Sequence, residues 1–94
     1  MIKIEINKNK IYRLTKVAGK NKNSGVQPGQ FAEGPGRVLE AGKDRYCVLV
    51  RDTLGTGDLT FIRTSQVIKI IEKKVNVILF ETIGGFYSLE EIKP

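Results

Sequence analysis

Residues 45–51, with the sequence RYCVLVR, decide the fold class of this chain. Side chains alternate between the two faces of a strand, and over residues 46–50 both faces are apolar. Such a run is typical of a central strand that is covered on both sides. Just upstream, residues 37–41 are also β-rich, and Gly42-Lys43-Asp44 supplies the turn between the two runs. The pattern predicts two consecutive strands, the second of them central in a sheet.

The period of two continues towards the C-terminus. Strands are expected over residues 59–63, 67–71 and 75–80. Gly84-Gly85 predicts a hairpin turn that leads into residues 86–89. No window of ten or more residues shows a convincing helical stripe, so the sequence predicts an all-β protein.

Towards the N-terminus, isoleucines alternate with charged residues over residues 2–6, and residues 11–17 are again β-rich. Together these runs predict a hairpin over residues 2–17. Residues 18–36 differ, because they hold five of the ten glycines and two of the three prolines. They are expected to form a long loop, and loops beyond ~12–15 residues in a compact domain are usually functional or disordered.

Four runs in the middle of the chain resemble SH3-like and KOW-type small β-barrels. They are GRVLE at 36–40, RYCVLVRD at 45–52, GDLTFI at 57–62 and SQVIKI at 65–70. The resemblance implies a small barrel core, and it implies a partner among nucleic acids, ribosomal surfaces, peptides and proteins. The loop at 18–36 departs from it, because such a barrel normally opens more tightly. In overall style the chain is similar to small uncharacterised phage proteins.

The expected organisation is therefore one all-β domain spanning the 94 residues, with hairpins flanking an SH3-like core. Its parts are an N-terminal hairpin (1–17), a Gly-rich loop (18–36), a barrel-like core (37–71) and a C-terminal hairpin (75–94). No apolar run approaches the ~18 residues of a membrane span, and the N-terminus lacks a signal-peptide pattern. A cytoplasmic location and no membrane partner are expected.

Composition argues against catalysis. The chain has no histidine, which removes the commonest general base and metal ligand, and one cysteine, which allows no internal disulfide. Cys47 is interpreted as a small buried residue, and Asp52 as a turn residue whose carboxylate caps nearby backbone amides. No acidic residues have a spacing that selects a catalytic pair. We therefore expect no catalytic residue, no metal, no cofactor and no enzymatic activity.

The distribution of charge gives the main functional hypothesis. Residues 1–24 hold seven basic residues and one acidic residue, whereas residues 25–94 hold nine of each. A basic hairpin and Gly-rich loop could neutralise phosphates, and an aromatic ring there could stack on a base. The sequence thus predicts a binding module for nucleic acid or a nucleotide, with the ligand held by Arg13, Lys16, Lys20, Lys22, Phe31 and Arg37. The alternative is that the lysines keep a small β-protein soluble.

A second hypothesis rests on the apolar C-terminal strands. Residues 75–80 and Phe86-Tyr87 are apolar on both strand faces, which suits either a sheet edge that binds a protein or a central strand of the monomer. The first alternative predicts an inhibitor or adaptor, such as a phage protein that blocks a host defence factor. Its partner would be a host protein or a second copy of the chain, and its interface would be Val77, Leu79, Phe86 and Tyr87.

Overall fold

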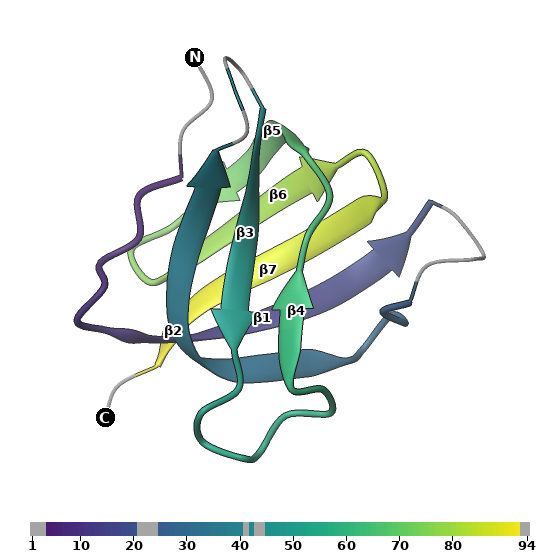
Figure 1. Cartoon of the computed structure of the whole chain (residues 1–94). Coiled ribbons are helices and arrows are strands. Elements are labelled where there is room, and N and C mark those ends of the chain that lie inside the picture. Colours follow the sequence, from purple (N-terminus) through teal and green to yellow (C-terminus); the bar gives the residue numbers. More distant parts are fainter. Residues whose placement is uncertain (1–3, 21–24, 41, 43–44, 93–94) are drawn as a thin grey trace.

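The computed structural model describes residues 4–20, 25–40, 42 and 45–92. Within these residues the chain forms seven β-strands and no helix, which confirms the all-β class (Figure 1). The strands are β1 (Ile11–Gly19), β2 (Phe31–Glu40), β3 (Tyr46–Arg51), β4 (Phe61–Arg63), β5 (Val67–Lys73), β6 (Val77–Thr82) and β7 (Gly85–Ile92). The described part of the chain accordingly contains no helix long and apolar enough to span a membrane.

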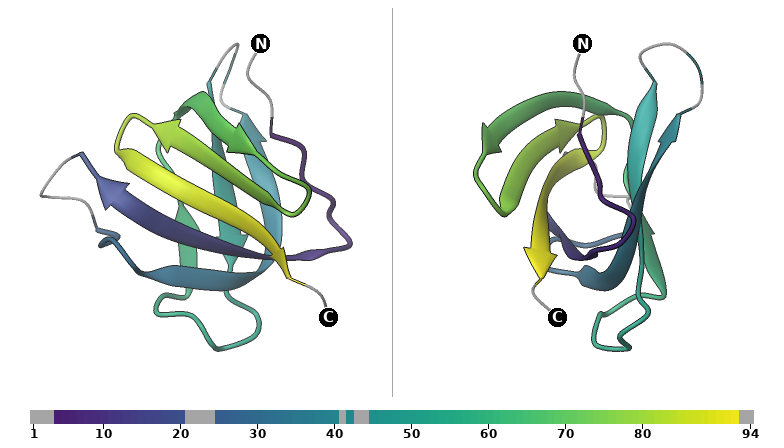
Figure 2. Two further views of the ribbon diagram at one scale, coloured as in Figure 1. Left: turned by 180° about the vertical axis from the view of Figure 1, so that it is seen from behind. Right: turned by 90° about the vertical axis from the view of Figure 1, so that its left-hand side faces the viewer.

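One antiparallel sheet holds all seven strands, in the order β4-β3-β2-β1-β7-β6-β5. Strand β2 turns a corner, because Phe31–Pro35 pair with β1 whereas Gly36–Glu40 pair with β3. The sheet therefore curls until β5–β7 lie opposite β2 and β3 (Figure 2). Its two end strands, β4 and β5, are joined by residues 64–66. The first of these residues, Thr64, extends the β3–β4 ladder: Thr64 N donates to Val48 O over 2.9 Å and Val48 N donates to Thr64 Oγ1 over 2.9 Å.

The core lies between these two layers. Alternate residues of β1, β3, β4, β6 and β7 point inwards and bury their side chains, as the period of two requires. The largest apolar ones, each at most 2% exposed, are Leu14, Val48, Val50, Ile62, Phe80 and Leu89. The rings of Phe80 and Tyr87 stack across β6 and β7 with centroids 5.9 Å apart. Aromatic stacking of this kind adds about 1 kcal/mol to the burial itself.

The expected loop at 18–36 is too long, because β1 continues through Gly19 and β2 already begins at Phe31. Its glycines serve close approach as well as turning. A Cβ on Gly34 would lie 1.8 Å from the carbonyl oxygen of Arg51, so no side chain fits there. At the neighbouring residue, Glu33 O accepts hydrogen bonds from Thr53 N and Leu54 N. At Gly34 the glycine therefore lies within a strand, because the absence of a side chain lets the backbone of residues 51–53 pack against it.

The hairpin predicted over residues 2–17 is not formed by the described residues, because residues 4–7 carry no strand. Strand β1 pairs with β2 along one edge and with β7 along the other, so neither edge is left for this segment. Its alternation still has a physical role. Ile4 is 2% exposed in the core and Ile6 packs against it, while Asn7 N donates to the Tyr12 hydroxyl over 2.9 Å. The segment runs beside β2 and covers an opening of the curled sheet (Figure 2).

Candidate functional site

Of the three predicted cations at residues 13–20, Arg13 and Lys20 already contact carboxylates of the same molecule, and Lys16 is buried. Arg13 lies against Glu33, with Nε 2.9 Å from Oε2, and its guanidinium sits 5.4 Å from the centre of the Phe31 ring. Arg13 and Phe31, which are both predicted to bind the ligand, therefore lie next to each other. Nε and Nη2 both lie 2.9 Å from the same oxygen, Glu33 Oε2, so this carboxylate occupies one edge of the guanidinium that could otherwise hold a phosphate.

Lys16 is part of the interior. Its side chain is 1% exposed, and Nζ donates a hydrogen bond to the carbonyl oxygen of Val26 over 2.8 Å. Burial lowers the pKa of the Lys16 amine, because the charged form loses its hydration. A ligand-binding role for Lys16 stays a prediction, and the burial of this amine argues against direct contact with a nucleic acid backbone.

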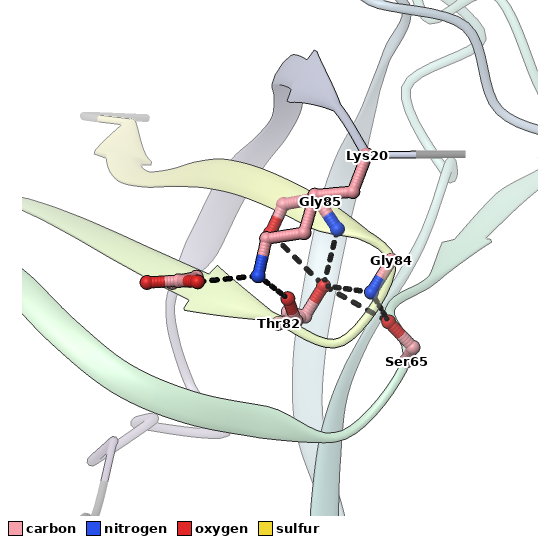
Figure 3. Close-up of polar contacts among 6 residues, drawn as sticks. Lys20, Ser65, Thr82, Gly84 and Gly85 are labelled. Atoms are coloured by element: carbon pink, nitrogen blue, oxygen red, sulfur yellow. Dashed lines mark hydrogen bonds and ion pairs between the residues drawn. The ribbon is translucent and has the colours of Figure 1, made fainter. Parts of the chain in front are cut away.

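Lys20 anchors the end of β1 to the β6–β7 turn. Its Nζ contacts the Glu81 carboxylate and donates to the Thr82 carbonyl oxygen over 2.9 Å, and it lies 5.3 Å from the Phe86 ring centre. Beside it, the Thr82 hydroxyl accepts hydrogen bonds from Ser65 Oγ and from the amides of the Gly84-Gly85 turn (Figure 3). This cluster is a turn-closing network. Lys22, the other predicted lysine, lies outside the described residues.

A different set of cations gathers on the outer surface of β2, β3 and β4. The register places Arg37, Leu49 and Arg63 side by side across the three strands, and it places Arg51 opposite Phe61. Val50 and Ile62, the neighbours of these residues, are fully buried, so the five side chains share the outward face. We call Arg37, Leu49, Arg51, Phe61 and Arg63 the arginine face.

The positive charges of the arginine face are exposed and have no carboxylate partner among the described residues. All three arginines are exposed, and none of them takes part in an ion pair with another described residue. Phe61 is 53% exposed between them. Sequence reasoning found Arg37 but missed Arg51, Arg63 and Phe61. The period of two could have placed Arg51 and Leu49 on one face, but only the strand register shows that Arg37 and Arg63 join them.

A groove of about 800 Å³ runs along β2 next to this face. Apolar side chains line most of it, with basic and acidic groups among them. The lining residues are Ile4, Ile6, Pro35, Val38 and Leu49, together with Lys8, Arg37, Arg51 and Glu5. Three cations and one carboxylate therefore line a largely apolar groove, a composition suited to an anion that also carries a flat or apolar group.

The residues predicted as a protein interface do not form an edge. Strand β6, which holds Val77 and Leu79, is paired on both sides, with β5 and with β7. Tyr87 is 3% exposed in the core, and Phe86 is half-buried beneath Lys20. On this side of the sheet the end strand is β5, whose Ile68 and Ile71 are 39% and 44% exposed.

The acidic residues of the β3–β4 connection have structural partners. Asp52 Oδ1 accepts hydrogen bonds from Glu33 N over 2.9 Å and from Gly57 N over 3.1 Å, so the predicted capping role is confirmed. Asp58 Oδ2 accepts one from Phe31 N in the same way. Among the described residues, no group of three His, Cys, Asp or Glu could hold a metal ion. Cys47 is buried, as its sequence context predicts.

Fold and site together define a small all-β protein with an uncompensated cationic surface. Comparisons with family models, with curated proteins and with solved structures give no match for the chain.

Proposed function

We propose that this protein is a non-enzymatic module that binds nucleic acid through the arginine face. The observation that carries the proposal is a group of three exposed arginines on one sheet surface, without carboxylate partners among the described residues and beside an exposed phenylalanine. Guanidinium groups match phosphate oxygens with two parallel hydrogen bonds, and an aromatic ring stacks on bases of any sequence. The SH3-like resemblance stays a prediction, and the proposal does not depend on it.

The dimensions of the face suit an extended polyanion. Adjacent strands lie about 4.8 Å apart, so Arg37 and Arg63 project from backbones roughly 10 Å apart, on either side of Leu49. Arg51 adds a third cation two residues beyond Leu49, on the same face of β3. A chain of phosphates crossing the three strands would therefore meet several guanidinium groups in succession.

Ion pairs elsewhere in the molecule distinguish the arginine face from the other basic residues. Lys10, Arg13 and Lys20 contact Glu91, Glu33 and Glu81, respectively. The N-terminal cations thus use carboxylates supplied by the electrically neutral remainder of the chain. The arginines of β2, β3 and β4 have no carboxylate partner within the described ranges, so their positive charge is left uncompensated on this surface.

The test is a binding titration of labelled single-stranded oligonucleotides at several salt concentrations. In the variant Arg37→Ala/Arg51→Ala/Arg63→Ala we expect much weaker binding and a shallower dependence of log K on log salt, by about 0.7 for each phosphate that the variant no longer neutralises. The matched control is Lys69→Ala/Lys73→Ala/Lys74→Ala, which removes the same formal charge from β5 and its following turn, in the opposite layer (Figure 2). Equally weakened binding in both variants would contradict the proposal.

A second candidate function, binding of a partner protein, is supported by β5. This strand has one neighbour in the sheet, and exposed Ile68 and Ile71 lie along it. A partner retained from nuclease-treated lysate by the wild-type protein and by the triple arginine variant, but not by Ile71→Lys, would favour this candidate. A partner that the wild-type protein retains from untreated lysate but loses after nuclease treatment would favour nucleic acid binding.

A further inference from the structure

The groove beside the arginine face has the composition of a site for one nucleotide. We infer that it holds a single unpaired base with its phosphate, and that the preferred ligand is therefore single-stranded nucleic acid whose bases carry an exocyclic amino group. This inference rests on the proposed function and specifies the ligand of that same surface.

The apolar part of the groove would receive the base. Half-buried Leu49 lines it from the outward face, half-buried Val38 lines it from the inner face of β2, and Pro35 adds an exposed ring. A nucleobase has flat apolar faces, and it can enter a groove only after leaving the base stack. Double-stranded nucleic acid keeps its bases paired and stacked, whereas single strands can present them to a protein surface. The groove volume of about 800 Å³ lies in the range of small-ligand sites.

Different charged groups at the groove would contact the phosphate and the base of the nucleotide. Lys8, Arg37 and Arg51 line it and would hold the phosphate. Glu5 is the one acidic residue among the described residues of the lining, and a carboxylate accepts hydrogen bonds from amino groups but has none to donate. Cytosine and adenine carry such an amino group, whereas thymine presents a carbonyl oxygen at the equivalent position. Glu5 therefore favours cytosine and adenine over thymine.

The groove also continues into the arginine face. Arg37, Leu49 and Arg51 belong to both, and Arg51 lies opposite Phe61 in the register. A strand with one base in the groove could therefore stack a neighbouring base on the exposed Phe61 ring. The geometry assigns two base positions of different character: a selective one at Glu5 and a tolerant one at Phe61.

The experiment compares dissociation constants for oligo(dC) and oligo(dT) of equal length at one salt concentration and neutral pH. We expect roughly tenfold tighter binding of oligo(dC), from one discriminating base contact. Because both ligands carry the same charge, the ratio of the two constants is independent of overall electrostatics. In Glu5→Gln the ratio should fall towards one, since an amide can both donate and accept. The matched control Glu72→Gln, on β5, should leave it unchanged.

Failure of the two proposals would look different. Equal binding of oligo(dC) and oligo(dT), an unchanged ratio in Glu5→Gln, or equally tight binding of a duplex of the same length would overturn the nucleotide site. The arginine face would still stand if binding remained salt-dependent and required Arg37, Arg51 and Arg63. Absence of binding to every oligonucleotide, RNA included, would overturn both.

Discussion

At the scale of single residues, the burial of Lys16 should make the free energy of unfolding change with pH in the alkaline range. Burial lowers its pKa below the ordinary 10.5, so between the two values the unfolded chain binds more protons than the folded one. Stability should therefore rise as the pH increases through the folded-state pKa towards 10.5. Lys16→Met should remove this rise, which urea unfolding of both proteins at a series of pH values would measure.

Two buried tyrosines also change stability in the alkaline range, so their effect must be separated from that of Lys16. Burial raises the pKa of Tyr46 and of Tyr87 above the ordinary 10.0, so their contribution to stability is lost as the pH rises beyond that value. Both proteins contain these tyrosines, so the difference between their curves reports Lys16 alone. Parallel curves below pH 10 would show that the amine titrates alike in the folded and unfolded chains.

Gly34 gives a second prediction at this scale. A Cβ at this position would lie 1.8 Å from the Arg51 carbonyl oxygen and 2.9 Å from Thr53 N, so backbone on two segments would have to move. We expect Gly34→Ala to lower the free energy of unfolding by about 2–3 kcal/mol. Gly25→Ala is the control, because a Cβ there meets nothing within 4 Å, and its effect should stay within about 0.5 kcal/mol. Comparable midpoints in urea for the two variants would contradict this assignment.

At the scale of elements, the N-terminal segment is held by burial and not by a strand ladder. Ile4 is 2% exposed in the core, and residues 4–7 belong to no strand. Ile4→Ala should therefore lower the free energy of unfolding by about 2–4 kcal/mol, although no strand is altered. Val75→Ala, at a residue that is 96% exposed, should change it by less than about 0.5 kcal/mol. Thermal unfolding of both variants checks this, and similar melting temperatures would refute a core role for Ile4.

At the scale of the whole molecule, the sheet joins the two ends of the chain. Strand β1 pairs with β7 from Ile11↔Ile92 to Gly19↔Gly85, so its central contacts span nearly the full sequence. Closing such distant pairs is slow, and all-β domains with this property fold in milliseconds to seconds. Stopped-flow refolding followed by tyrosine fluorescence should give one phase in this range. A microsecond phase carrying the full amplitude would mean that local hairpins, and not the β1–β7 pairing, limit folding.

Much of the local structure follows from the sequence by itself. The period of two fixes which residues of a strand share a face, so β3 lies within the predicted residues 45–51 and Cys47 is identifiable as buried. Of the predicted strand at 59–63, only Phe61–Arg63 form β4. Asp52 can be assigned as a backbone cap, because short carboxylates in turns bond to nearby amides. These features depend on residues close together in the chain. They need no knowledge of which strands become neighbours.

The location of free charge was decided only by the tertiary structure. The sequence places all the excess positive charge in residues 1–24, yet Arg13 meets Glu33 and Lys20 meets Glu81, 20 and 61 positions away. The physical reason is that an ion pair depends on distance in space, and strand register sets that distance. Pairing of β1 with β2 and β7 brought Arg13 and Lys20 to their carboxylates, and the register of β2, β3 and β4 gathered Arg37, Arg51 and Arg63 on one face without a carboxylate partner among the described residues.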